Sequence, residues 1–218
     1  MTNPIPFLAA LLVTTQVITA HAADMGKPQG YDWSGPYAGV FGGYVWSSTK
    51  VTDLGVIVES AAPTNGLIGG LTAGYNVQND QWVYGLDVDA GLGSVQGHGI
   101  AVVPPANPNV YDLNFVGHVR ARLGLSPDQG PFMAYLAGGV GIASFKFTNG
   151  ENGEQTTGTY IAPSLGVGVE YAASNNLSLR FEGLYDAFSI GSGMIVANDY
   201  KAWLNDAVTV RVGLDYRF

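Results

Sequence analysis

The chain has 218 residues, with 31 Gly, 12 Tyr, 9 Lys plus Arg and 17 Asp plus Glu, and a net charge of −8. This balance argues against a nucleic-acid partner, which needs a basic surface, and the apolar content argues against disorder. Cysteine is absent, which excludes a disulfide framework and a thiolate metal site. The length suits one domain of the barrel or sandwich type.

Residues 1–22 are predicted to be a cleaved signal peptide. The apolar run IPFLAALLVTTQVITA ends at Ala20, and Ala20-His21-Ala22 is an A-x-A cleavage signal. The segment MTNPIP before it lacks Lys and Arg, which departs from the usual leader. An uncleaved anchor is disfavoured because the run falls short of about 18 to 20 clean apolar residues. We therefore expect a periplasmic N-terminal segment over 23–34 and a barrel over 35–218, with no membrane-spanning helix.

The rest of the chain alternates with a period of two, which is typical of strands. Two segments, 35–46 and 131–147, are apolar on both faces, so their inward face stays open. Pro163 cannot donate to a ladder and is expected to mark the start of its strand. Six further segments each have an apolar face opposite a polar or charged one: 67–77, 82–92, 111–125, 161–171, 177–187 and the closing strand that ends at Phe218.

The connections between these eight strands alternate in length. Three are short and polar, at 78–81, 126–130 and 172–176, and four are long, at 47–66, 93–110, 148–159 and 189–206. This alternation is typical of bacterial outer-membrane barrels. The sequence therefore predicts an all-β, eight-stranded antiparallel up-and-down transmembrane β-barrel with four long surface loops and short periplasmic turns.

A soluble barrel such as a lipocalin has the same period of two, but its apolar side chains point into the barrel and its charged side chains point outward. Three observations favour lipid on the apolar face. All five arginines lie on the polar faces, these faces hold no Lys, and aromatic residues cluster near strand ends, as in membrane barrels. Tyr75, Trp82, Tyr84, Tyr171 and Tyr216 fall near the short turns, and Tyr111 and Tyr185 fall toward the long loops.

The lumen of an eight-stranded barrel has room only for side chains. Inward charges must therefore be paired, because a lone buried ion costs several kcal/mol. Simple hairpin pairing places Asp87 opposite Arg120, Asp89 opposite His118 and Arg180 opposite Asp215. The predicted structural salt network comprises Asp87, Asp89, His118, Arg120, Arg122, Glu170, Arg180, Glu182, Arg211, Asp215 and Arg217.

Three stretches resemble the small porin-like outer-membrane barrels of alphaproteobacteria, whose members are described as immunogenic proteins and some as hemin-binding proteins or small porins. DWSGPYAGVFGGYVW resembles their first strand, GVGVEYAASNNLSLRFEGLYDAF their sixth and seventh, and VTVRVGLDYRF their last. The resemblance spans the mature chain and implies the fold and the Gram-negative outer membrane. It also implies that Tyr216 and Phe218 form the end read by the barrel-assembly machinery.

The functional alternatives remain open at the level of sequence. We expect a structural, surface-exposed envelope protein, a monomer that contacts membrane lipid and lipopolysaccharide, with no cofactor and no metal. One alternative is a surface site for hemin, with His98 as the candidate ligand and Tyr111 as its helper. Another is a narrow porin-type channel. No nucleophile–base set can be named, so an enzyme is not expected.

Overall fold

The computed structural model describes residues 30–53, 56–98, 100–101, 110–150, 153–190, 194–197 and 200–218. For the strand segments within 49–62, 100–101 and 194–204, only the path of the backbone is described. The predicted signal peptide and residues 23–29 lie outside the described residues.

Eight long strands make the wall of the molecule. They are β1 (Gly35–Asp53), β2 (Val56–Asn79), β3 (Trp82–His98), β5 (Val110–Leu125), β6 (Phe132–Thr148), β7 (Gln155–Ala172), β8 (Leu177–Asp186) and β11 (Ala207–Arg217). The shorter elements are β4 (Ile100–Ala101), β9 (Met194–Ala197), β10 (Tyr200–Leu204) and the 3₁₀ turns η1 (Pro127–Gln129) and η2 (Phe188–Ile190). In the described part of the chain, no helix is long and apolar enough to cross a membrane.

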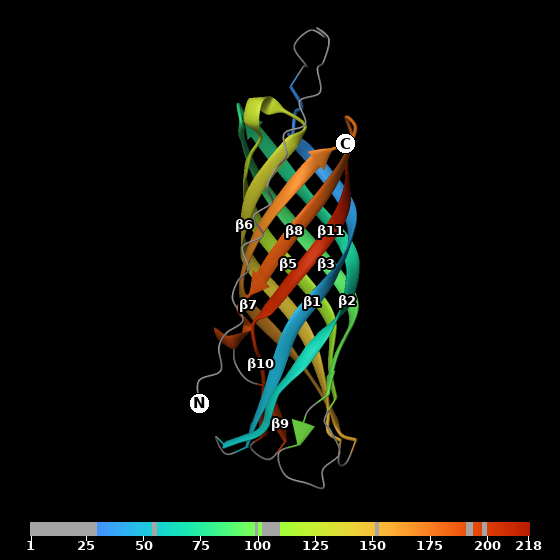
Figure 1. Ribbon diagram of the computed structural model, residues 1–218, viewed down its shortest axis with the longest axis vertical. Helices are drawn as coiled ribbons and strands as arrows, with labels where there is room; N and C mark the ends of the chain where they lie inside the picture. Colours follow the sequence, from blue (N-terminus) through green and yellow to red (C-terminus); the bar gives the residue numbers. More distant parts are fainter. Residues whose placement is uncertain are drawn as a thin grey trace, which may run out of the picture.

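The wall closes on itself. Each long strand pairs with the next in sequence, and β11 pairs antiparallel with β1 from Tyr37–Arg217 to Trp46–Val208. The short turns lie at one end with the C-terminus, and the β9–β10 hairpin lies at the other end (Figure 1). The predicted closed, eight-stranded, antiparallel up-and-down barrel is therefore confirmed, and closure leaves no long edge strand unpaired.

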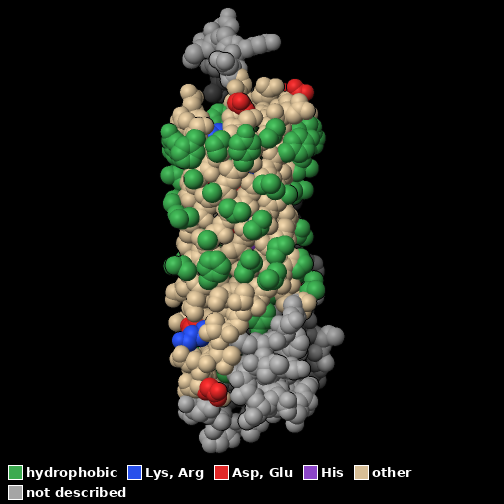
Figure 2. Space-filling model, turned by 180° about the vertical axis from the view of Figure 1, so that it is seen from behind, with side chains coloured by type: hydrophobic (Ala, Val, Ile, Leu, Met, Phe, Trp, Pro, Cys, Tyr) green, Lys and Arg blue, Asp and Glu red, His purple; other side chains and the backbone are tan. Residues whose placement is uncertain are grey.

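Apolar side chains cover the outer surface of the barrel over much of its height. Leu67, Leu71, Leu86, Leu92 and Leu165 are each more than 60 % exposed. Figure 2 shows hydrophobic side chains along this wall, and charged side chains only near its two ends. A soluble protein does not display such a surface, whereas a bilayer requires it. We call this part of the barrel, which spans Trp82–Leu92 on β3, the membrane section.

Aromatic residues border the membrane section. On the turn side, Tyr75, Trp82, Tyr84, Tyr171 and Tyr216 are exposed, as predicted, and Phe132 joins them. On the loop side, Tyr185 is exposed as predicted, together with Trp46. Aromatic girdles at both interfaces are typical of membrane barrels.

The two strands with ambiguous faces are assigned by the structure. On β1, Tyr37, Phe41 and Val45 point inward, and on β6, Met133 and Tyr135 do so. These large inward side chains lie beside charged lumen residues; the ring of Phe41, for example, lies under the guanidinium of Arg211 at 4.6 Å. Aromatic packing against arginine explains why these strands are apolar on both faces.

The strands extend farther toward the loop end than their apolar outer faces indicate. Most of the predicted 47–66 loop is the paired ends of β1 and β2, and 93–98 and 155–159 belong to β3 and β7. We call the strand parts beyond the loop-side girdle the outer section. Its outward side chains are mostly polar and exposed or half-exposed: Ser94, Gln96, His98, Asp112, Asn114, Ser144, Lys146, Thr148, Gln155, Thr157 and Thr159.

The inside of the outer section is apolar. Tyr111 stacks on Phe145 with ring centroids 5.9 Å apart, and Phe145 meets Tyr160 edge-on at 6.3 Å. The same buried cluster contains Phe41, Val45, Ile68, Val95, Leu113, Val116, Ala143, Phe147, Ala162, Phe188 and Ala207. The outer section therefore has the layout of a soluble barrel, with an apolar core and a polar surface.

A β-bulge at Asn114 corrects one predicted face. Leu113 pairs with Phe145 and Phe115 with Ser144, so Asn114 is an extra residue on β5. Because one extra residue reverses the alternation, Tyr111 and Leu113 point inward and not toward lipid as predicted. Tyr111 is 1 % exposed and is not part of the aromatic girdle.

Two smaller predictions are also wrong. Pro163 lies within β7, eight residues after its start, because its missing N–H faces the side where β8 has ended at Asp186. The Pro163 carbonyl on that same side accepts from the Ala187 N–H at 3.0 Å. Ala187, predicted to face lipid, lies just past β8 and is 9 % exposed.

Candidate functional site

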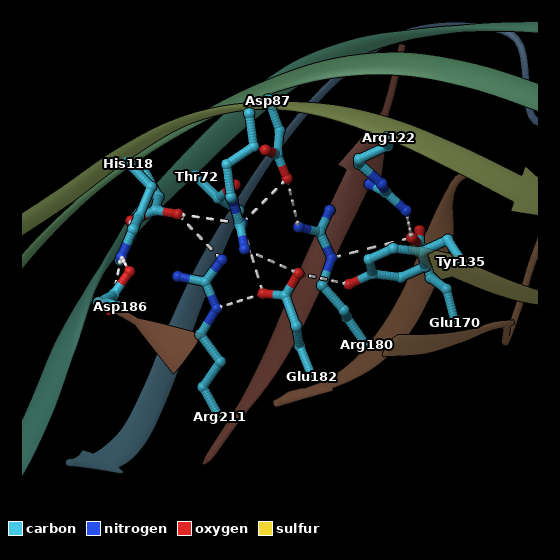
Figure 3. A network of polar contacts seen from close by, with 12 residues as sticks. Thr72, Asp87, His118, Arg122, Tyr135, Glu170, Arg180, Glu182, Asp186 and Arg211 are labelled. Atoms are coloured by element: carbon cyan, nitrogen blue, oxygen red, sulfur yellow. Dashed lines mark hydrogen bonds and ion pairs between the residues drawn. The ribbon is translucent and has the colours of Figure 1, made fainter. Parts of the chain in front are cut away.

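The most distinctive chemistry of the molecule is a network of charged side chains in the lumen of the membrane section (Figure 3). Arg120 of β5 lies at its centre. Its Nη2 contacts Asp87 Oδ2 and Asp89 Oδ2, each at 3.2 Å, and its Nη1 contacts Glu182 Oε1 at 3.1 Å. Asp87 and Asp89 come from β3 and Glu182 from β8, so one guanidinium links strands on opposite sides of the lumen.

Arg211 of β11 binds two of the same carboxylates from another direction. Its Nε donates to Glu182 Oε2 at 2.6 Å and its Nη2 donates to Asp89 Oδ2 at 2.9 Å. The hydroxyl of Tyr135 donates to Glu182 Oε1 at 2.9 Å. Asp89 and Glu182 are thus each shared by several donors, an arrangement that offsets the cost of burying their charges.

A second group lies nearer the turn end. Arg122 Nη2 donates to Glu170 Oε2 at 2.7 Å, and Ser178 Oγ donates to Glu170 Oε1 at 2.6 Å. The Arg122 guanidinium lies 4.0 Å from the centre of the Tyr135 ring and donates to the Tyr37 hydroxyl at 2.9 Å. These aromatic side chains fill the space between the charges, so the lumen is packed at this level.

Two of the three strand pairings predicted for the network are found. Asp87 pairs with Arg120, and Asp89 pairs with His118. The third is wrong by two residues, because Asp215 pairs with Ser178 and Arg180 with Gly213. Arg180 Nη2 nevertheless reaches Asp215 Oδ2 diagonally at 2.7 Å. The long arginine side chain makes the contact insensitive to the register.

His118 bridges two carboxylates at the loop-side limit of the network. Its Nδ1 lies 2.8 Å from Asp89 Oδ1 and its Nε2 lies 3.2 Å from Asp186 Oδ1. Asp186 is absent from the predicted network, although it shares its face of β8 with Arg180 and Glu182. That shared face is the signal that would have identified it. Tyr37 and Tyr135 were missed because the faces of their strands were ambiguous.

The candidate hemin residues do not converge. Tyr111 pairs with Gly97 and His98 pairs with Val110, so the two side chains point to opposite faces of the wall. His98 is exposed and Tyr111 is buried. In this arrangement they cannot bind one ligand together. Hemin binding through His98 alone stays a prediction. No three or more His, Cys, Asp or Glu residues in the described ranges are grouped to hold a metal.

Residues 30–34 form a strap across the turn end of the lumen. Trp33 is fully buried, and its Nε1 donates to Ser126 Oγ at 3.1 Å and to the Gly130 carbonyl at 3.3 Å. Its ring lies 4.8 Å from the guanidinium of Arg217. Tyr31 donates its N–H to the Gln129 carbonyl at 2.6 Å, and burial raises the pKa of its hydroxyl. The strap closes this end of the barrel.

Asp32 turns outward within the strap. Its carboxylate accepts from the Ser34 N–H at 2.9 Å, and this hydrogen bond lowers the pKa of Asp32. Beside it lies an open hollow of about 1160 Å³. Polar residues of the strap and the turns line this hollow: Tyr31, Asp32, Asp80, Gln81, Asp128, Gln129, Ser174 and Asn175.

The proposed assembly signal lies at the turn-side girdle. Tyr216 and Phe218 are 50 % and 74 % exposed, and their rings meet edge-on with centroids 5.3 Å apart. The Phe218 N–H donates to the Pro36 carbonyl at 3.1 Å, which ties the last residue to β1. Their role in recognition by assembly machinery stays a prediction.

Comparison with known proteins agrees with this architecture. The 31 kDa outer-membrane immunogenic protein of Brucella melitensis biotype 1 is 30 % identical over 229 residues, covering 97 % of this chain and 95 % of the relative. The 25 kDa outer-membrane immunogenic protein of Brucella canis is 31 % identical over 190 residues, covering 86 % and 80 %. The 22 kDa outer membrane protein of Rhizobium leguminosarum bv. viciae is 30 % identical over 192 residues, covering 88 % and 81 %.

Solved structures with low sequence identity share the fold. OprG of Pseudomonas aeruginosa matches with a TM-score of 0.52 at 12 % identity, covering 85 % of this chain and 96 % of that one. Neisserial surface protein A matches with a TM-score of 0.50 at 16 % identity, covering 85 % and 98 %. The family described as the outer membrane protein beta-barrel domain matches residues 7–218. With its lipid-facing wall and charged lumen, this chain belongs to that family and resides in the outer membrane of Gram-negative bacteria.

Proposed function

We propose that the protein is a closed, non-conducting barrel whose role is structural and surface-exposed. The observation that carries this proposal is the filled lumen. In the described part of the chain, twelve acidic, arginine and histidine side chains are buried inside the barrel: Asp87, Asp89, His118, Arg120, Arg122, Glu170, Arg180, Glu182, Asp186, Arg211, Asp215 and Arg217. The apolar core of the outer section lies on their loop side, and Trp33 lies on their turn side. A solute would have to displace all three layers.

The outer section gives this closed barrel a surface to present. Its strands continue past the loop-side girdle and form a stem with a packed apolar interior beyond the membrane section. Its polar outward side chains fit contact with lipopolysaccharide, while the apolar wall below fits membrane lipid. We further propose that the assembly machinery reads the end of β11, where Tyr216 and Phe218 are exposed.

We propose no enzymatic activity. The His118–Asp89 pair has the geometry of a base with an orienting carboxylate, but both side chains are 1 % exposed. A substrate cannot approach them through the packed layers on either side. In the described part of the chain, no serine or threonine hydroxyl hydrogen-bonds to His118, so a nucleophile is lacking there as well.

Planar-bilayer recording tests the closed barrel against the narrow-channel alternative. Refolded wild-type protein, with insertion checked by protease protection, should give no steady single-channel current. Steady conductance that scales with the number of inserted barrels would overturn the proposal. A mixed bilayer with lipopolysaccharide in one leaflet addresses the partner: thermal stability should rise relative to phospholipid alone, and an unchanged stability would contradict the contact.

A further inference from the structure

We propose that Asp89, His118 and Asp186 form a buried proton-binding site that fastens the membrane section to the base of the last loop. This inference rests first on hydrogen-bond chemistry. Both ring nitrogens of His118 face carboxylate oxygens, at 2.8 Å from Asp89 and 3.2 Å from Asp186. A neutral imidazole donates through only one nitrogen, whereas an imidazolium donates through both. Two carboxylate partners therefore require an additional proton.

The proton belongs on His118. If the ring were neutral, one aspartate would have to be protonated to donate to it, and an imidazole is a far stronger base than a carboxylate. The triad holds the same number of protons in either description. The arrangement of donors and acceptors therefore assigns one bound proton, with the imidazolium as the form that satisfies both partners.

The charge balance of the lumen gives an independent argument. Among the described residues, the buried charged side chains comprise six carboxylates, five guanidinium groups and His118. With a neutral histidine the lumen would carry one uncompensated negative charge inside the membrane section. With His118 protonated, the buried charges balance. An uncompensated buried charge costs several kcal/mol, so the balanced state is favoured.

Groups on every neighbouring strand are compatible with a cation at His118. On β3, Asp89 contacts the ring, and on β8, Asp186 does so. The nearby cations Arg120 and Arg211 both bind the other oxygen of Asp89 and do not contact the imidazole. On β6, Gly141 pairs with His118, and a Cβ there would lie 2.8 Å from Asp186 Oδ1. A side chain at position 141 would therefore collide with Asp186, so the site is tightly closed on this side.

The location of the site gives the proton a structural consequence. Asp186 is the last residue of β8, and two residues later buried Phe188 begins η2. The His118–Asp186 contact crosses the lumen from β5 to β8, which are not neighbours in the sheet. Loss of the proton would leave two buried carboxylates facing a neutral ring, and would release the end of β8 where the outer section begins.

NMR of barrels labelled with ¹⁵N-histidine tests the protonation directly. A barrel beginning at residue 23 contains two histidines, and exposed His98 gives the reference signal in the same spectrum. Both ring nitrogens of His118 should carry protons in detergent micelles at about pH 8, where an ordinary imidazole is neutral. A neutral tautomer of His118 at this pH would overturn the proposal.

A variant tests the consequence. His118→Gln keeps one amide donor but cannot carry charge, and His98→Gln is the matched control. We expect His118→Gln to lower the folding equilibrium constant roughly a hundredfold near neutral pH, and to abolish the loss of wild-type stability at alkaline pH. If His118→Gln lost stability at alkaline pH in the same way as the wild type, the proposed site would be contradicted. If this variant does not fold, the wild-type spectrum still decides.

Discussion

The membrane section and the outer section are built from the same strands and have opposite insides. On β3, the inward side chains are Asp87 and Asp89 within the membrane section and Val95 beyond it. The outward side chains of β3 are apolar within the membrane section, as at Leu86 and Leu92, and polar beyond it. The inward–outward alternation of β3 continues through the change, although the register between β3 and β5 shifts between Leu92 and Val95.

The solvent outside the wall explains this inversion. Where lipid surrounds the barrel, apolar side chains face outward and the polar ones must be buried and paired in the lumen. Where water surrounds it, the apolar side chains supply a core by the hydrophobic effect. The two sections are therefore stabilised by different interactions, and substitutions should affect them differently.

The largest effect should come from Arg120 in the membrane section. Arg120→Met keeps a long side chain but leaves Asp87, Asp89 and Glu182 without their shared cation. Removing one partner of a buried ion pair costs about 3–5 kcal/mol, so the free energy of unfolding should fall by this amount. Denaturant titration in lipid vesicles, followed by tryptophan fluorescence, measures it.

Val119→Met is the matched control for that variant, because the neighbouring side chain is 55 % exposed on the lipid-facing surface. It should change stability little. Equal losses in the two variants would show that the charged network does not hold the membrane section together.

An arginine placed on the outward face should distinguish the two sections. Leu86→Arg introduces a charge into the lipid-facing surface and should lower stability by about 2–4 kcal/mol. Ser94→Arg lies on the same face of the same strand but in the outer section, and should cost less than about 0.5 kcal/mol. Urea titration of both variants in one lipid gives the comparison; similar costs would mean that the membrane boundary is misplaced.

Deleting Asn114 should disturb the outer section alone. Without the bulge, the alternation of β5 would turn Tyr111 and Leu113 away from the apolar core. We expect local opening of the outer section to become easier by about 1–2 kcal/mol, seen as faster amide hydrogen exchange near the loops. Asn114→Ala keeps the bulge and should exchange like wild type. Faster exchange throughout the membrane section would contradict this separation.

The smallest effect should come from Asp32, which lies outside both sections. Its pKa is lowered by the Ser34 hydrogen bond, so the carboxylate stabilises the strap above its unfolded pKa and loses this contribution as the pH falls through its folded pKa. The effect is small because the side chain is exposed and screened by water. Asp32→Asn should remove the change in tryptophan fluorescence at the turn end that accompanies a fall in pH. If the change persists in this variant, another titrating group is responsible for it.

Sequence periodicity predicted the membrane section well because one face of each strand there is uniformly apolar. The faces of 67–77, 82–92 and 161–171 agree with the structure, as do the three short turns. The charged lumen followed from the same alternation, since residues opposite a lipid-facing surface must point inward. Arg180 and Asp215 show its limit: their contact is found, but their register differs from the predicted one.

The outer section was missed for a physical reason. Beyond the girdle, the outward residues become polar, and 47–66 and 148–159 then resemble loops even though much of their backbone stays paired. The bulge at Asn114 leaves no mark in the hydrophobic pattern, so Tyr111 was assigned to the wrong face. The strap was also missed, because the partners of Trp33 are distant in sequence.

That distance gives the strap a place in the order of folding. Trp33 needs Gln78 from the end of β2, Ser126 and Gly130 from the second turn, and Arg217 from the last strand. Its site is complete only after β11 has joined β1. Since contacts across long sequence separations form late, the indole should enter its site as the final event of assembly. The burial of Trp33 would then be an intrinsic reporter of the moment at which the barrel closes.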